Sequence, residues 1–249
     1  MKRIELTSEE FKSFLTLFNT SYESIIYYKH DTVYKIFRRA KDPNNEYAKY
    51  DETVLENKRK KIVLLNEMNL DQYFLKPQEL VYIDGEFRGY TMDFASLDTL
   101  GDMMFKKRKD KIKYLKEARQ LITKAHDKGI ILGDVNPHNF IFKDDFLALG
   151  DLDNSTISSY KTDVFNHNIS GKYLYYHPLD KDLDIFLFNV MTVSLLTKIA
   201  PSYILMTPNY KIKGRKLSCI HNHLLNFTDK NYKNQEILDI LDDKTKRLL

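Results

Sequence analysis

The segments HDKGIILGDVNPHNFIF (His126–Phe142) and LALGDLDNS (Leu147–Ser155) hold the most informative residues of the chain. In each segment a short apolar run, typical of a strand, ends in Gly-Asp, and these aspartates are Asp134 and Asp151. Asn139 follows Asp134 in the same loop. Two carboxylates and a carboxamide at neighbouring strand ends offer only oxygen donors, which suits Mg²⁺ rather than zinc. A carboxylate that is not bound to the metal can accept a proton from a hydroxyl group.

An upstream lysine extends this set of polar residues. Lys35 lies in TVYKIF (Thr32–Phe37), whose β-branched and aromatic residues predict a strand, and from such a strand its ammonium group can reach a phosphate. Taken alone, Lys35 would be interpreted as an exposed strand lysine. Asp151 and Asp153 alone would be interpreted as turn residues, because Asp and Asn favour turns. The combination of these residues in one chain is what favours the chemical interpretation.

Composition limits the class of protein. The chain has 249 residues and a formal net charge of +4, and its 43% hydrophobic content is enough to close a core, which excludes disorder as the main description. This length fits one large domain or two closely packed lobes. No run approaches the ~18 apolar residues of a membrane helix, and the opening MKRIELTSEEF lacks the apolar region of a signal peptide.

Cysteine count and charge distribution exclude further classes. Cys219 is the one cysteine, so the chain has neither an internal disulfide nor a multi-cysteine zinc site. Charges of both signs are interspersed, and the basic run Lys106–Lys109 is interpreted as a solvated face. We therefore expect a soluble cytoplasmic monomer that binds neither nucleic acid nor a membrane.

The hydrophobic patterns predict a strand-rich first third and a helical remainder, with the change near residues 94–96. In the first part the expected elements are a helix over 8–18 that begins at a Thr7–Glu10 capping box, strands over 25–28 and 32–37, a helix over 51–68, and a hairpin of strands 79–83 and 87–94 around Asp84-Gly85-Glu86. In the second part they are an amphipathic helix through residues 112–125, short strands over 130–132, 140–142 and 147–149, a buried helix over 185–196 and a helical tail over 234–249.

At these motifs the sequence resembles the protein-kinase-like superfamily. GDVNPHN is similar to the catalytic loop, with Leu132-Gly133-Asp134 where His-Arg-Asp is usual, and DLDNS is similar to the metal-binding DFG motif. Gly-Asp at this place also occurs in aminoglycoside phosphotransferases. GDxNPxN and a D-x-D-S version of the metal motif are closer to an atypical bacterial serine/threonine kinase branch. The resemblance extends from about residue 20 to residue 196.

The resemblance implies an α+β, bilobal kinase-like fold that forms one domain. A small antiparallel β N-lobe would span residues 1–94, and a reduced, mostly helical C-lobe would span residues 95–249. Asp184 would be the buried aspartate at the start of the large C-lobe helix, and His126 is interpreted as a packed or hydrogen-bonded core residue.

The resemblance also implies roles for single residues. Asp134 would be the catalytic base, and Asn139 and Asp151 would bind magnesium. Lys35 would hold the α and β phosphates of ATP. The remaining cofactor-binding residues would be Ser21 and Ser24 in the phosphate-covering segment, Met92 beside the adenine, Asp93 and Ala95 in the hinge, and a helix glutamate paired with Lys35. Glu56 is the preferred glutamate because about three helical turns follow it, with Glu67 and Glu52 as alternatives.

Several positions depart from the family pattern. The first glycine of the chain is Gly85, so no glycine-rich loop precedes Lys35. Asn136 stands where most protein kinases have a lysine, and Leu152-Asp153 replaces Phe-Gly after the metal aspartate. We expect an ATP- and Mg²⁺-dependent kinase that phosphorylates Ser/Thr hydroxyls of a protein, autophosphorylation included. The alternatives are a small-molecule kinase, a pseudokinase that only binds, and a kinase-fold enzyme that transfers a nucleotide.

Overall fold

A computed structural model describes residues 1–18, 23–38, 52–161, 180–198 and 200. The chain divides into two compact units, and each is described by itself. Unit 1 comprises Met1–Ser96 and Gly150–Asp153, and unit 2 comprises Leu97–Leu149 and Asn154–Leu249. Within the described ranges, no helix has the length and apolar character needed to cross a membrane.

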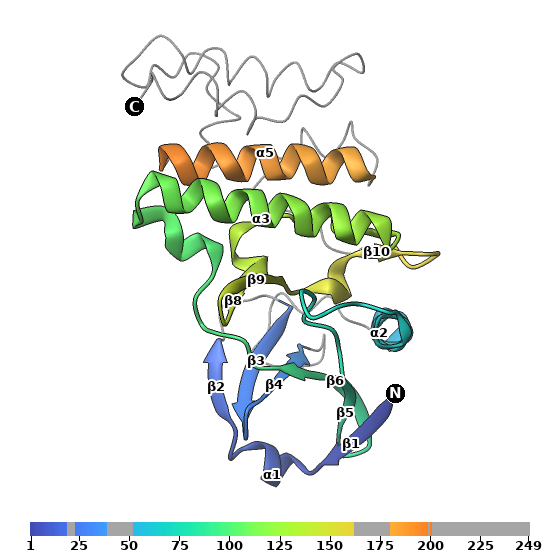
Figure 1. Cartoon of the computed structure of the whole chain (residues 1–249). Coiled ribbons are helices and arrows are strands. Elements are labelled where there is room, and N and C mark those ends of the chain that lie inside the picture. Colours follow the sequence, from blue (N-terminus) through green and yellow to red (C-terminus); the bar gives the residue numbers. More distant parts are fainter. Residues whose placement is uncertain (19–22, 39–51, 162–179, 199, 201–249) are drawn as a thin grey trace. The chain divides into compact units, whose positions relative to one another are not determined.

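Unit 1 is built on a six-stranded sheet in the order β1-β5-β6-β4-β3-β2 (Figure 1). Its strands are β1 (Lys2–Leu6), β2 (Leu15–Phe18), β3 (Ser24–Lys29), β4 (Thr32–Phe37), β5 (Glu79–Ile83) and β6 (Glu86–Asp93). All neighbours are antiparallel except β1 and β5, which pair in parallel. The helices that the structure describes in this unit are α1 (Ser8–Phe11) and α2 (Glu52–Glu67).

The β5–β6 turn and a close contact between the backbones of β6 and β4 fix the register of the central strands. The β5–β6 turn has Asp84 at φ 50° and Gly85 at φ 81°, a left-handed pair that the predicted Asp-Gly turn requires. Gly89 lies on β6 where it passes β4. A Cβ atom there would lie 1.9 Å from the carbonyl oxygen of Lys35, so the strand pairing beside Lys35 depends on a glycine.

One hydrophobic cluster of unit 1 lies between the sheet and α2. The apolar stripe of α2 packs against side chains of β4, β5 and β6, in a cluster made of Phe37, Leu55, Ile62, Leu80 and Tyr90. Figure 1 shows α2 beside the sheet. Met92 is half-buried against the same cluster. The helix is therefore held by burial of one face, which is the usual source of helix stability in a folded protein.

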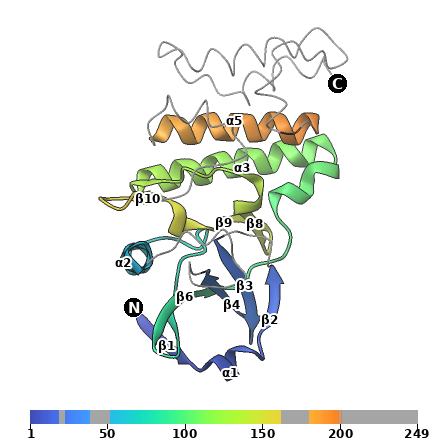
Figure 2. The same ribbon diagram turned by 180° about the vertical axis from the view of Figure 1, so that it is seen from behind.

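The described part of unit 2 is mostly helical. Its long helices α3 (Arg108–Asp127) and α5 (Lys181–Thr197) lie side by side (Figures 1 and 2). Shorter elements are η1 (Leu100–Phe105), β7 (Ile130–Ile131) paired with β10 (Thr156–Ile157), η2 (Pro137–Asn139), and the hairpin of β8 (Phe140–Lys143) and β9 (Phe146–Leu149). A further short turn, η3, covers Leu152–Asn154, of which Leu152 and Asp153 belong to unit 1 and Asn154 to unit 2. The expected stripe of α3 is buried at Leu115, Ala118, Ile122 and Ala125.

These elements confirm the α+β class, with a mostly antiparallel sheet first and helices later. The expected helix over 8–18 is wrong beyond its first turn. It begins at the predicted capping box, but it ends at Phe11, and Leu15–Phe18 form β2. A helix this short gains little by itself, whereas pairing with β3 satisfies the backbone of Leu15–Phe18. The expected helical tail over 234–249 lies outside the described residues.

Candidate functional site

Lys35 lies in the middle of β4, opposite Ile26 on one side and Tyr90 on the other. Alternation along the strand places it on the same face as Val33 and Phe37, and like them it is buried. Its exposed fraction is 4%, so Lys35 is not a solvent-facing strand lysine. A buried ammonium group is very costly unless anions surround it.

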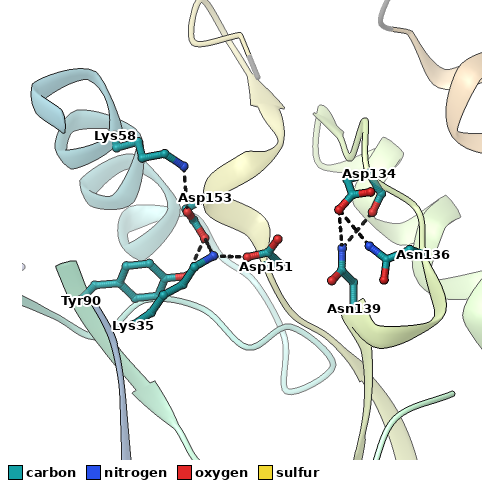
Figure 3. Close-up of polar contacts among 8 residues, drawn as sticks. All are labelled: Lys35, Lys58, Tyr90, Asp134, Asn136, Asn139, Asp151 and Asp153. Atoms are coloured by element: carbon teal, nitrogen blue, oxygen red, sulfur yellow. Dashed lines mark hydrogen bonds and ion pairs between the residues drawn. The ribbon is translucent and has the colours of Figure 1, made fainter. Parts of the chain in front are cut away.

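Two carboxylates supply these anions. The Lys35 ammonium donates to Asp151 and, at 2.6 Å, to Asp153 Oδ1 (Figure 3). Burial lowers the pKa of Lys35, but the charges of Asp151 and Asp153 outweigh it, and the pKa lies well above its ordinary value. Lys35 is therefore a permanent cation at neutral pH. We call Lys35, Lys58, Tyr90, Asp151 and Asp153 the lysine cluster.

Asp153 is the centre of the lysine cluster. Its side chain is fully buried, Tyr90 donates its hydroxyl to Oδ1 at 2.7 Å, and Lys58 of α2 lies 3.1 Å from Oδ2. Burial raises the pKa of Asp153, but the positive charges of Lys35 and Lys58 dominate and hold that pKa far below its usual range. Burial, followed by the charge of Asp153, raises the pKa of Tyr90, so Tyr90 keeps the proton that it donates.

Asp151 differs from Asp153 in exposure and backbone. Its side chain is 26% exposed, and its φ of 58° lies in the left-handed region, which non-glycine residues seldom adopt. Strained backbone of this kind is concentrated at functional sites. Asp151 is therefore the carboxylate of the lysine cluster that an ion from solvent reaches more easily.

The second group of predicted residues is in unit 2, in the loop between β7 and η2. Asn136 donates to Asp134 Oδ2 at 2.8 Å (Figure 3). Asn139 donates its side-chain amide to the Asp134 carbonyl oxygen at 2.9 Å and lies 3.4 Å from Oδ2. Asn136 also caps η2, since its side chain accepts a hydrogen bond from His138 N at 2.9 Å, and Pro137 suits the first position of this turn. Two neutral amides thus orient a half-buried carboxylate.

A buried aspartate of α5 supports this loop. Asp184 accepts hydrogen bonds from the backbone N–H groups of Leu132 and Gly133, each at 2.8 Å. His126 Nε2 lies 2.8 Å from the same carboxylate. The expectation of His126 as a hydrogen-bonded core residue is confirmed, and Asp184 connects α3, α5 and the strand end that precedes Asp134.

The expected pair between Lys35 and a helix glutamate is not formed. Glu56 accepts two hydrogen bonds from Arg59, both at 2.7 Å, and the ion pairs of Lys35 are with Asp151 and Asp153. Helix periodicity gives the reason. Leu55 and Ile62 define the buried stripe of α2, and Lys58 lies on that stripe, whereas Glu56 is on the flank.

The other expected cofactor residues are scattered over unit 1. Ser24 is buried at the start of β3, Asp93 is exposed at the end of β6 and accepts a hydrogen bond from Gln78, and Ala95 is half-buried. Ser21 lies outside the described residues. The nucleotide-binding roles of these residues and of Met92 stay predictions.

The donor types fit magnesium, although one complete metal site is not seen. Among the described residues, no group of three or more His, Cys, Asp or Glu side chains is placed to hold a metal ion. Asn139 uses its amide nitrogen on Asp134, so its side-chain oxygen, which has no protein partner in the described part of the chain, suits a hard cation. The oxygen donors of Asp151 belong to unit 1, and those of Asn139 belong to unit 2.

Sequence reasoning missed Lys58 and Tyr90. The signal for Lys58 was its place between Leu55 and Ile62 at helical spacing, and the signal for Tyr90 was its hairpin position opposite Lys35. Comparison with known proteins adds no assignment, since no protein-family model matches the chain and no curated protein matches it.

Proposed function

We propose that the protein is an ATP- and Mg²⁺-dependent kinase with a bilobal kinase-like fold, which transfers the γ-phosphoryl group to a Ser/Thr hydroxyl of a protein. The observation that supports this proposal most strongly is the buried cation at Lys35, held by Asp151 and Asp153. A lysine held in this way presents a localised positive charge of the kind that binds a phosphate. The order of motifs, from Lys35 to Asp134 and then Asp151, agrees with the resemblance.

In the proposed reaction, Lys35 neutralises the phosphates of ATP and keeps them in place. Asp134, held by Asn136 and Asn139, orients the substrate hydroxyl and accepts its proton. The bond between the γ-phosphorus and the bridging oxygen breaks, a bond from the hydroxyl oxygen to that phosphorus forms, and ADP leaves with the electron pair. Asp151 and the side-chain oxygen of Asn139 would hold Mg²⁺, which supplies charge neutralisation of the phosphates.

A second candidate is a pseudokinase, a binding module of the same fold without turnover. The observation that favours it is the ion pair between Lys35 and Asp151. In this pair the proposed phosphate-binding lysine and the proposed metal-binding carboxylate are bound to each other. The sequence also lacks a glycine before Gly85 to cover phosphates. Turnover would require Asp151 to exchange Lys35 for the metal, whereas a binding module would not.

The test is incubation with γ-labelled ATP and Mg²⁺, alone and with a generic basic protein. Asp134→Asn removes the proposed base at nearly constant volume, and Asp144→Asn is the matched control. Asp144 is an exposed aspartate of the β8–β9 turn with φ 51°, a conformation that asparagine tolerates. We expect acid-stable, protein-bound label with the wild type and the control, and a loss of about 100-fold or more in Asp134→Asn.

Other outcomes separate the alternatives. Stabilisation by Mg·ATP without transfer to protein, followed by label on an added aminoglycoside or another small alcohol, would replace the protein kinase with a small-molecule kinase. Stabilisation without label on any acceptor would favour the pseudokinase. Equal label in Asp134→Asn and the wild type would contradict the assigned role of Asp134.

A further inference from the structure

Lys58 is a charged residue on the apolar stripe of α2. The stripe repeats at gaps of three, four and three through Leu55, Lys58, Ile62 and Leu65, and all four side chains are buried. The exposed fraction of Lys58 is 2%. Lysine is almost never buried to this extent without a specific anionic partner, because the desolvation of its ammonium is so costly.

The side chain of Lys58 is directed into the lysine cluster (Figure 3). Its ammonium lies 3.1 Å from Asp153 Oδ2 and 5.1 Å from the centre of the Phe37 ring, close enough for a cation–π contact. Phe37 lies on β4, two residues beyond Lys35 on the same face. Lys58 is thus held by an anion and by an aromatic ring of the strand that bears Lys35.

The two oxygens of Asp153 are divided between two elements. Oδ1 accepts from Lys35 of β4 at 2.6 Å and from Tyr90 of β6 at 2.7 Å, while Oδ2 faces Lys58 of α2. A carboxylate that accepts hydrogen bonds at both oxygens has little freedom to rotate. The position of the Lys35 ammonium therefore depends on Asp153, and the position of Asp153 depends on Lys58.

We propose that Lys58 is a positioning residue for phosphate binding by Lys35, acting through Asp153. A helix glutamate was expected to contact Lys35 directly. Instead the helix contributes a cation, Lys58, and the carboxylate of Asp153 lies between Lys58 and Lys35. This inference rests on the proposed function, since it assumes that Lys35 binds the phosphates of ATP. A small misplacement of such a group is enough to lower transfer strongly.

The first experiment compares Lys58→Met with Lys60→Met. Lys60 is on the same helix, half-exposed, and lies 3.8 Å from Glu56, so it is a matched control outside the lysine cluster. We expect Lys58→Met to weaken Mg·ATP binding, measured by calorimetry, and to raise the KM for ATP by about tenfold or more, whereas Lys60→Met stays within about twofold of the wild type. Lys58→Arg keeps the charge and is expected to recover most of the affinity.

The second experiment tests whether Lys58 acts through Asp153. In a double-mutant cycle, Lys58→Met is combined with Asp153→Asn, which removes the intermediate carboxylate. We expect Lys58→Met to change the KM for ATP by less than about twofold in the Asp153→Asn background, because the connection to Lys35 is already broken. Independent, multiplicative effects of the two substitutions would overturn the inference.

The outcomes also distinguish this inference from the proposed function. If Lys35→Met abolishes Mg·ATP binding while Lys58→Met lowers only the melting temperature, the inference fails and the proposed function stands. A rescue of stability but not of affinity by Lys58→Arg would likewise assign Lys58 a purely structural role. If the wild type neither binds nor turns over Mg·ATP, the proposed function fails, and the inference fails with it.

Discussion

Asp153 in unit 1 and Asp134 in unit 2 have the same side chain in opposite surroundings. Asp153 is fully buried between two ammonium groups and a phenol, and its pKa is far below the usual range. Asp134 is half-buried and receives hydrogen bonds from the neutral amides of Asn136 and Asn139. Asp153 is thus fixed by the cations around it, whereas Asp134 is oriented by hydrogen bonds at a site that is partly open to solvent.

Replacing each of the two aspartates with asparagine should give the largest difference in stability between the two sites. Asp153→Asn leaves Lys35 and Lys58 buried beside a neutral amide, and we expect it to lower the free energy of unfolding by about 3–5 kcal/mol. Asp134→Asn is expected to lower it by about 1 kcal/mol or less, because its site is half-exposed. Urea denaturation followed by circular dichroism measures both.

Equal losses of stability at the two positions would contradict this division of roles. A loss below about 1 kcal/mol for Asp153→Asn would mean that water reaches the lysine cluster and screens its charges.

The pH dependence of stability should show the range in which the charges of the lysine cluster stabilise the fold. The pKa of Asp153 is lowered by folding, so its contribution is complete above the unfolded value of about 3.9 and is lost as pH falls towards the folded value. The pKa of Lys35 is raised by folding, so its contribution is complete below the unfolded value of about 10.4 and is lost as pH rises through the folded value. The lysine cluster should therefore stabilise the fold fully between about pH 5 and pH 10.

The measurement is the difference in unfolding free energy between the wild type and Asp153→Asn as a function of pH. We expect this difference to be constant from about pH 5 to pH 9 and to shrink below about pH 4. A difference that grows on acidification would have the wrong sign for a depressed carboxyl pKa.

The smallest effect is expected at the neutral amides. Asn136→Ala removes the donor to Asp134 and the cap of η2, and each lost hydrogen bond should lower stability by about 1 kcal/mol. Because Asp134 loses one of its orienting groups, kcat should fall by about tenfold with an unchanged KM for ATP. Asn66→Ala in unit 1 is the control, since Asn66 donates to the carbonyls of Pro77 and Gln78, away from both groups. A similar fall in kcat in both variants would contradict the orienting role.

The local elements could be predicted from the sequence wherever one pattern dominated. The Asp-Gly turn, the stripe of α3 and the apolar run of α5 each formed as expected. The prediction of a helix over 8–18 was wrong because a capping box indicates where a helix begins and not where it ends. Pairing of β2 with β3 then determined the structure of residues 15–18.

The polar residues of the candidate site were found by motif, but their contacts were not. Lys35 and Asp153 are 118 residues apart in the chain, and Lys58 and Asp153 are 95 apart, so no local periodicity connects them. A lysine within a helical stripe is normally assigned to solvent, and for that reason Lys58 was overlooked in favour of Glu56. Which charge faces the strand is decided by tertiary packing, which only the structure provides.

Unit 1 is closed by a segment from much later in the chain, and this has a consequence for biosynthesis. A ribosome releases every strand of the six-stranded sheet well before it adds Gly150–Asp153. Until then Lys35 lacks both of its anions, and burying it would be unfavourable. The nascent sheet must therefore leave this lysine hydrated and wait for Asp151 and Asp153 before its interior closes. A fragment that stops at Ser96 would contain all the strands and still lack the charges that complete their core.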